Sequence, residues 1–333
     1  MTDSDAAHLA ERVRAGDRRA LARAITLVES TRTDHRVQAE TLLEAVLPQT
    51  GGATRLGISG VPGVGKSTFI EAFGLHLVRA GHRVAVLAVD PTSSRTGGAI
   101  LGDKTRMEEL ARTREAFIRP SPTGGTLGGV ARRTREAMLI CEAAGFDVVI
   151  VETVGVGQSE TVVADMVDMF LLLLLPGGGD ELQGIKKGIS EIADLLVVNK
   201  ADTGHEVAAE AAAAEYRSAL RMIRPASEAW QPPVRTASAL EGRGLDGVWE
   251  TIRDYESRMR AGGHLDRRRA QQARSWMWSE VEESLQRAFR EHQGVAARLN
   301  ELEQAVTAGQ IPATKAAREL LAIFQGRRDD TPA

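Results

Sequence analysis

The chain has 333 residues, of which 43% are hydrophobic and 26% charged, and its net charge at pH 7 is −3. This composition is ordinary for a soluble globular protein, and the charge argues against a nucleic-acid or polybasic membrane surface. A single cysteine, Cys141, excludes an internal disulfide framework. Because no apolar run approaches the roughly 20 residues that a membrane helix needs, we expect a cytoplasmic protein with neither nucleic acid nor membrane among its partners.

The first 50 residues are predicted to be helical. Asp17 is placed to cap a helix over Arg18–Glu29, and Val37–Leu47 repeats apolar residues with the spacing of one helix face. The following stretch from Pro48 to Gly52 contains turn-forming residues and indicates a linker. We therefore predict an N-terminal helical extension over residues 1–50.

From residue 55 onwards, short apolar runs alternate with longer amphipathic ones. Several runs are apolar throughout, which is typical of parallel strands covered on both faces, and their alternation with helices indicates an open α/β sheet. A ligand of such a sheet is expected at the carboxyl ends of its strands. The predicted strands, within a domain over residues 51–262, are Leu56–Ser59, Val84–Val89, Phe117–Arg119, Val148–Val151, Phe170–Leu175, Leu195–Val198 and Val234–Thr236.

After Gly262-Gly263 the pattern is helical again to about Ile323, and Pro312 is expected to start the last helix. The cluster Trp276-Met277-Trp278 is expected to begin a helix with further apolar residues on one face. That face fits packing within the chain or a dimer seam, and the pattern leaves both readings open. Its further apolar members are Val281, Leu285 and Phe289.

The segment from Gly60 to Ser67 fits the phosphate-binding loop pattern G-x-x-x-x-G-K-[ST], between a predicted strand and an amphipathic helix. Its glycines allow backbone N–H groups to surround phosphates, to which the helix N-terminus adds its dipole. Lys66 is expected to reach the β- and γ-phosphates as a catalytic residue, and the Ser67 hydroxyl to bind magnesium. The residues expected to hold the phosphates are Gly60, Val61, Pro62, Gly63, Val64, Gly65, Lys66, Ser67 and Thr68.

The base is predicted from the segment after the strand Leu195–Val198, which has the form N-K-x-D. The Asp202 carboxylate can accept hydrogen bonds from N1–H and the 2-amino group of guanine, whereas adenine offers neither donor. We therefore predict a P-loop NTPase with a mostly parallel sheet that uses GTP. The residues expected around the base are Asn199, Lys200, Asp202, Ser238, Ala239 and Leu240.

Acidic residues at strand ends supply candidate magnesium ligands, because Mg²⁺ prefers hard oxygen donors. Asp90 and Glu152 each follow a predicted strand, and both are expected to serve catalysis, with Asp103 as a further candidate ligand. Glu152 begins E-T-V-G in the place of the usual D-x-x-G, so we expect it to reach the metal through a water. The Gly155 N–H is expected to bind the γ-phosphate. Together with Ser67, these acids form the predicted magnesium site.

Hydrolysis by the chain alone is expected to be slow, because Val156 stands where a water-orienting glutamine is often found. The loops 90–102 and 153–160 have compositions suited to ordering by the γ-phosphate. A third loop begins with Gly177-Gly178-Gly179 and continues through charged residues to Lys186. The candidates for completing the hydrolytic site are Lys186, Arg95 and a residue of a partner protein.

Five of these segments together resemble one family, the methylmalonyl-CoA mutase-associated GTPases of the MeaB type, also called ArgK. They are GVPGVGKST, VDPTSSRTGGAILGDKTRM, ETVGVGQSE, PGGGDELQGIKKGI and VVNKAD. The resemblance implies a G-protein chaperone that docks on the adenosylcobalamin-dependent mutase, gates cofactor delivery and protects the mutase, which in turn accelerates GTP hydrolysis.

The resemblance also bears on assembly and on individual residues. It implies a homodimer formed through the C-terminal helical region, residues 263–333, and makes the adenosyltransferase of the mutase a further candidate partner. It implies that Asp90, Asp103 and Glu152 lie near magnesium and that residues 180–187 face the partner.

Three other functions remain open. A metal-delivery GTPase serving a nickel enzyme would need His or Cys clusters, whereas this chain has seven scattered histidines and one cysteine. A kinase acting on a transport protein would need a second substrate pocket and ATP, against which N-K-x-D argues. The third is a scaffold in which bound nucleotide locks a conformation without turnover; phosphate release with and without the mutase would distinguish it from an enzyme.

Overall fold

The computed structural model describes residues 3–89, 107–120, 127–153, 159–176, 192–221 and 229–326. The chain forms two compact units, Met1–Gln272 and Ala273–Ala333. The first unit contains the sheet and the N-terminal helices, and the second contains the C-terminal helices. Within the described residues, no helix combines the length and apolar character needed to cross a membrane.

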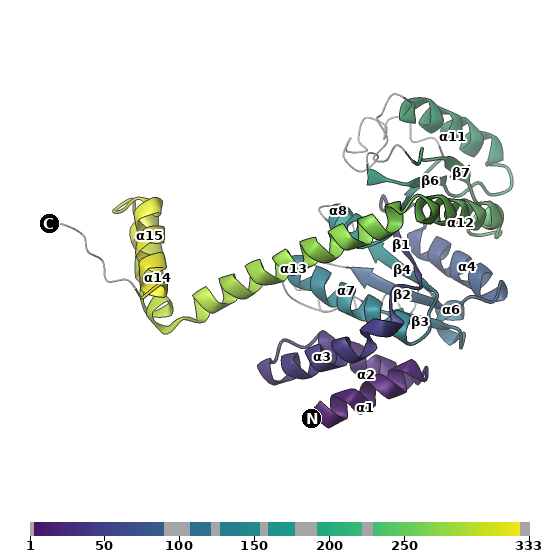
Figure 1. Ribbon diagram of the computed structural model, residues 1–333. Coiled ribbons are helices and arrows are strands. Elements are labelled where there is room, and N and C mark those ends of the chain that lie inside the picture. The colour runs from purple at the N-terminus through teal and green to yellow at the C-terminus, as the bar shows by residue number, and fades with distance from the viewer. Residues whose placement is uncertain are drawn as a thin grey trace. The chain divides into compact units, whose positions relative to one another are not determined.

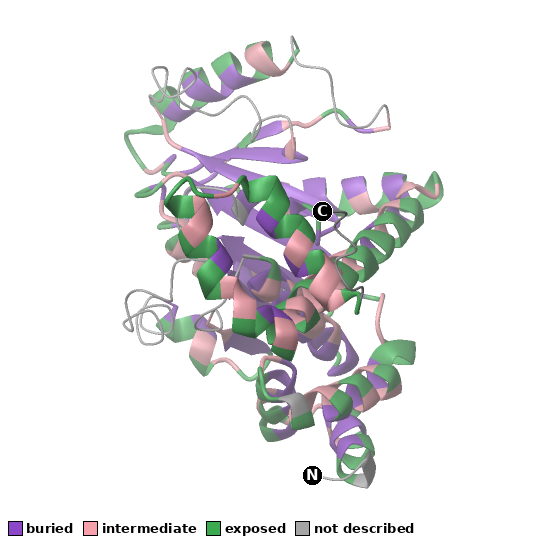
Figure 2. Ribbon diagram, turned by 90° about the vertical axis from the view of Figure 1, so that its left-hand side faces the viewer, coloured by how far each residue is buried: buried purple, intermediate pink, exposed green. Residues whose placement is uncertain are grey.

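A seven-stranded parallel sheet forms the centre of the first unit, with strand order β3-β2-β4-β1-β5-β6-β7. Figure 2 shows most of these strands buried. The sheet confirms the predicted α/β class, and the strand bounds differ from the predicted ones by at most two residues. The strands are β1 Thr54–Gly60, β2 Val84–Val89, β3 Ala116–Arg119, β4 Val148–Thr153, β5 Met169–Leu174, β6 Leu195–Val198 and β7 Val234–Thr236.

Helices cover both faces of the sheet, which explains why several strands, such as β2 and β5, are apolar throughout. Helices α4, α6 and α12 share one core with alternate strand residues such as Leu56 and Ile58. Helix α8 lies against the other face, where a Cβ on Gly57 would come within 2.9 Å of Val163 Cγ1. The helices of this part are α4 Lys66–Arg79, α6 Glu108–Arg112, α7 Leu127–Ala143, α8 Ser159–Ala164, α11 Glu206–Leu220 and α12 Leu245–Ala261.

The N-terminal helices pack on one another and on α7 (Figure 1). The Asp17 carboxylate caps α2, accepting from the backbone N–H of Arg19 at 2.8 Å and of Ala20 at 3.1 Å, as the sequence predicted. Arg119 on β3 forms an ion pair with Glu29 at the end of α2. These helices are α1 Asp3–Arg14, α2 Arg18–Val28 and α3 Thr33–Val46, followed by the 3₁₀ turn η1 Leu47–Gln49.

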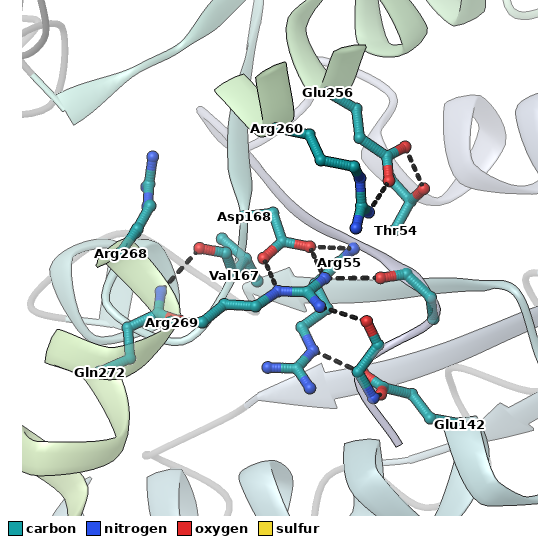
Figure 3. Close-up of polar contacts among 12 residues, drawn as sticks. Thr54, Arg55, Glu142, Val167, Asp168, Glu256, Arg260, Arg268, Arg269 and Gln272 are labelled. Atoms are coloured by element: carbon teal, nitrogen blue, oxygen red, sulfur yellow. Dashed lines mark hydrogen bonds and ion pairs between the residues drawn. The ribbon is translucent and has the colours of Figure 1, made fainter. Parts of the chain in front are cut away.

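At the amino edge of the sheet, an aspartate precedes each of β4, β5 and β6. Each of these carboxylates accepts a backbone N–H from the neighbouring strand region and contacts a basic side chain (Figure 3 shows the central part). Asp147 accepts the Arg83 N–H and contacts His82. Asp168 accepts the Arg55 N–H and contacts Arg269, and Asp194 accepts the Phe170 N–H and contacts Arg268. Two of these side chains come from the start of α13, which is thereby attached to the sheet.

Helix α13 runs from His264 to Glu291 and continues into the second unit. That unit adds α14 Gln293–Thr307 and α15 Ala313–Phe324, with Pro312 at the predicted start of the last helix. Its small core is formed by Val295, Leu302, Ala316 and Leu320.

The prediction that a helix begins at Trp276 is wrong, because this residue lies inside the 28-residue α13. The polar stretch before Trp276 is helical as well, and its Arg268 and Arg269 side chains bind aspartates at the amino ends of the strands. Met277, Trp278 and Leu285 are 54%, 53% and 57% exposed. Packing within the chain therefore leaves much of this apolar surface uncovered.

Candidate functional site

The predicted phosphate loop joins β1, which ends at Gly60, to α4, which begins at Lys66. Gly63 and Gly65 have φ of 81° and 86°, a left-handed conformation that favours glycine. A Cβ on Gly60 would lie 2.7 Å from the Leu173 backbone oxygen, so this position also needs glycine. The first N–H groups of α4 follow directly, which gives the loop the form of an anion site.

The Lys66 side chain folds back over this loop, and its Nζ donates to the Gly60 carbonyl oxygen at 2.8 Å. Burial lowers the pKa of the Lys66 ammonium, while the Glu152 and Glu160 carboxylates oppose that shift. Lys66 therefore lies in the field of two carboxylates. The predicted site did not include Glu160, a buried residue at the end of the ETVGVGQSE segment.

Glu152 lies near the end of β4, paired with Ile58 of β1 and Ala88 of β2, and is 4% exposed. The structure thus brings Glu152 into the neighbourhood of Lys66. Ser67 is half-buried in the first turn of α4. The other predicted residues of this half of the site, Asp90, Asp103, Gly155 and Lys186, lie outside the described residues, as does Arg95.

The predicted base residues converge from the ends of β6 and β7. The Asn199 side chain joins them to the phosphate loop, donating to the Val64 carbonyl oxygen at 2.9 Å and accepting from the Ala239 N–H at 3.3 Å. Lys200 is exposed and has φ of 60°, which is uncommon for a residue with a side chain. Leu240 is 78% exposed at the tip of its loop.

Asp202 is held by the buried Ser238 hydroxyl, which donates to Asp202 Oδ1 at 2.5 Å and accepts from the Glu241 N–H at 3.0 Å. A carboxylate has about four acceptor sites, so Asp202 keeps capacity for the two donors of guanine. The sequence placed Ser238 near the base but did not predict the hydrogen bond from its hydroxyl to Asp202.

A further layer of contacts ties the two base loops together. Arg243 donates to the Ala201 carbonyl oxygen at 3.1 Å and forms ion pairs with Glu206 and Glu241. The Thr203 N–H donates to Glu241 at 3.0 Å. These contacts hold the two loops against each other.

No group of three His, Cys, Asp or Glu side chains suited to a metal ion occurs in the parts of the chain that the structure describes. Cys141 is buried in α7, and burial raises the pKa of its thiol. It therefore packs in the core.

The chain is similar to several known proteins. A protein of Caulobacter vibrioides named as a GTPase is 63% identical over 316 residues, which cover 95% of this chain and 97% of that protein. The mouse protein named methylmalonic aciduria type A homolog, mitochondrial, is 50% identical over 322 residues, with 94% and 78% covered. A crystal structure titled LAO/AO transport system kinase is 42% identical with a TM-score of 0.76, covering 98% of this chain and 99% of its own.

The family model described as methylmalonyl Co-A mutase-associated GTPase MeaB matches residues 21–294. This match covers both the phosphate loop and the base loops, and it agrees with the resemblance found in the sequence. The chain belongs to the MeaB family of GTPases, enzymes that bind and hydrolyse GTP.

Proposed function

We propose that this GTPase depends on magnesium and acts as a G-protein chaperone for the adenosylcobalamin-dependent methylmalonyl-CoA mutase, serving cofactor loading and protection. The observation that carries the proposal is the family match over residues 21–294, whose description names the mutase. The name of the mouse relative, which refers to methylmalonic aciduria, supports the same metabolic setting. As a second partner we propose the adenosyltransferase of that mutase.

In this proposal, Lys66 contacts the β- and γ-phosphates, and Ser67 and Glu152 bind magnesium together with Asp90 and Asp103. The residues that the structure describes fit a magnesium ion, because the buried Glu152 carboxylate supplies a hard oxygen donor near the phosphate loop. When bound, magnesium would neutralise charge on the phosphate oxygens during transfer to water. Gly155 and Lys186 complete the proposed set at the γ-phosphate.

We also propose a homodimer formed through the C-terminal helical region, residues 263–333. The exposed apolar side chains of α13 support this, since Met277, Val281 and Leu285 recur every four residues on one side of the helix. Residues 1–50 and 51–262 are proposed as the helical extension and the GTPase domain. We propose a cytoplasmic location, whereas the name of the mouse relative places that protein in mitochondria.

Two alternatives predict different outcomes. A metal-delivery GTPase would bind a transition metal and not the mutase, and a nucleotide-locked scaffold would bind the mutase without turnover. The test is recovery of the mutase from native lysate by the tagged chain, loaded with GDP or with a non-hydrolysable GTP analogue, followed by phosphate release with the purified mutase. We expect recovery that depends on the nucleotide and release that is faster with the mutase. Equal phosphate release with and without bound mutase would contradict the proposal.

A further inference from the structure

A buried side-chain hydrogen bond joins the ends of β1 and β4. Thr153 Oγ1 donates to Ser59 Oγ at 2.8 Å, and the two residues are 0% and 2% exposed. Ser59 directly precedes Gly60, whose carbonyl oxygen binds Lys66, and Thr153 directly follows Glu152. The bond therefore connects a residue next to the phosphate loop with a residue next to Glu152.

This bond lies where the backbone pairing between β1 and β4 ends. The last paired residues of these two strands are Ile58 and Glu152. Beyond them, Ser59 and Gly60 pair with β5, whereas Thr153 pairs with Val89 of β2. At the next position of this register, where the backbone pairing of the two strands has ended, the hydroxyl pair bridges the strand leading to the phosphate loop and the strand carrying Glu152.

The hydroxyl pair faces away from the side of the sheet on which Glu152 lies. Side chains alternate between the faces of a strand, so Ser59 shares a face with Gly57, against which α8 packs. Ile58 belongs to the core under α4, and its partner Glu152 shares that face. The two hydroxyls therefore lie on the sheet face opposite Glu152, where they can influence the distance between the ends of β1 and β4.

We propose that Thr153 and Ser59 are positioning residues for GTP hydrolysis, which hold the Glu152 strand at a set distance from the phosphate loop. The proposal rests on the role of Glu152 at magnesium given under the proposed function. A displacement of about 1 Å between reacting groups can cost a factor of about 10² in rate. Nucleotide binding by the loop itself does not need this spacing, because the glycines and Asn199 shape the loop independently.

The test compares Thr153→Val, which keeps the side-chain shape but removes the donor, with Thr153→Ser, which keeps the hydroxyl. We expect Thr153→Val to lower kcat by between about 10-fold and 10²-fold and to raise the magnesium concentration needed for half-maximal rate. GDP affinity should stay close to that of the parent, and Thr153→Ser should recover most of the rate. Thr134→Val is the matched control, because Thr134 is also buried, at 3% exposed, and donates within α7, to the Val130 carbonyl oxygen.

A double-mutant cycle with Ser59→Ala separates the bond from its two partners. We expect the double variant Ser59→Ala/Thr153→Val to be no slower than Thr153→Val, since both changes break one interaction. The proposal would be overturned if the effects of Ser59→Ala and Thr153→Val on kcat multiplied in the double variant. It would also be overturned if Thr153→Val lost as much GDP affinity as kcat, or if Thr134→Val lost as much kcat as Thr153→Val. If Thr153→Val does not fold, Ser59→Ala and Thr153→Ser decide the same question. Failure of the magnesium role itself is seen separately, as parental turnover of Glu152→Gln.

Discussion

Arg269 and Asp168 form a two-point ion pair, with Nε to Oδ1 at 2.8 Å and Nη2 to Oδ2 at 2.6 Å (Figure 3). The same guanidinium donates to the carbonyl oxygens of Gly51 and Ala53, and Asp168 accepts the Arg55 N–H. One arginine of α13 thus binds the starts of β1 and β5 together with the segment predicted as a linker. That linker is held on both sides, because Glu142 accepts the Gly51 N–H.

Replacing Arg269 by methionine should destabilise the first unit by roughly 3 kcal/mol, since it leaves the Asp168 carboxylate buried without its partner. The control is Arg267→Met, because the Arg267 guanidinium is exposed and contacts only the preceding turn. We expect the control to stay within about 0.5 kcal/mol of the parent. Urea unfolding followed by circular dichroism measures both, and equal losses would contradict the importance of the ion pair.

Replacing Asp202 by asparagine should lower GTP affinity by about 10²-fold or more, which corresponds to a lost charged interaction of roughly 2–3 kcal/mol. The amide places a donor opposite the donors of guanine, and xanthosine nucleotides, which offer an acceptor there, should be favoured instead. Calorimetry with GTP and xanthosine triphosphate measures the change. A variant that binds GTP as the parent does would show that Asp202 does not contact the base.

Replacing Glu152 by glutamine should weaken magnesium-dependent hydrolysis while GDP binding stays nearly intact. The phosphate loop supplies most of the binding, whereas the carboxylate is assigned to the metal. The measurement is a magnesium titration of single-turnover hydrolysis beside GDP calorimetry. If the magnesium titration curves of Glu152→Gln and of the parent coincide, Glu152 has no part in binding magnesium.

Lys186 lies outside the described residues, and its prediction comes from the sequence alone. The segment that starts at Gly177 contains three glycines and several charged residues. A loop that only connects a strand to a helix is usually about two to six residues long and needs neither feature. We expect Lys186→Ala to keep the slow intrinsic hydrolysis and to lose most of the acceleration by the mutase. Coupling of this kind is typically worth about 1–3 kcal/mol. If the mutase at saturating concentration accelerates GTP hydrolysis by Lys186→Ala as fully as by the parent, Lys186 has no part in the response to the mutase.

Replacing Leu285 by glutamate should weaken the proposed homodimer, because it places a charge within the exposed apolar side of α13. We expect the dissociation constant to rise by about tenfold or more, the effect of losing roughly 1.4 kcal/mol at an interface. Gln286→Glu, at the exposed neighbouring position, adds the same charge on another side of the helix. Sedimentation analysis over a range of protein concentrations compares the two. Equal dissociation constants for both variants would place the dimer contact elsewhere.

The sequence by itself determined the strands, the phosphate loop and the base loop. These signals are local: an apolar run of three to six residues, the spacing of glycines before Lys66, or the N-K-x-D segment ending at Asp202 carries the information within one stretch. The return to helix after Gly262-Gly263 was predicted and α13 begins there, whereas the helix start expected at Trp276 was wrong, because the polar first turns of α13 carry no apolar period. Their position depends on Arg268 and Arg269 reaching the sheet edge.

The tertiary structure alone decided which distant side chains meet. Thr153 and Ser59 are 94 residues apart in the chain, and Arg269 and Asp168 are 101 apart. The same residue types in another strand order would not touch. Whether two such groups lie within hydrogen-bond distance depends on strand order, register and helix crossovers, and these are set by packing of the whole core rather than by any local pattern.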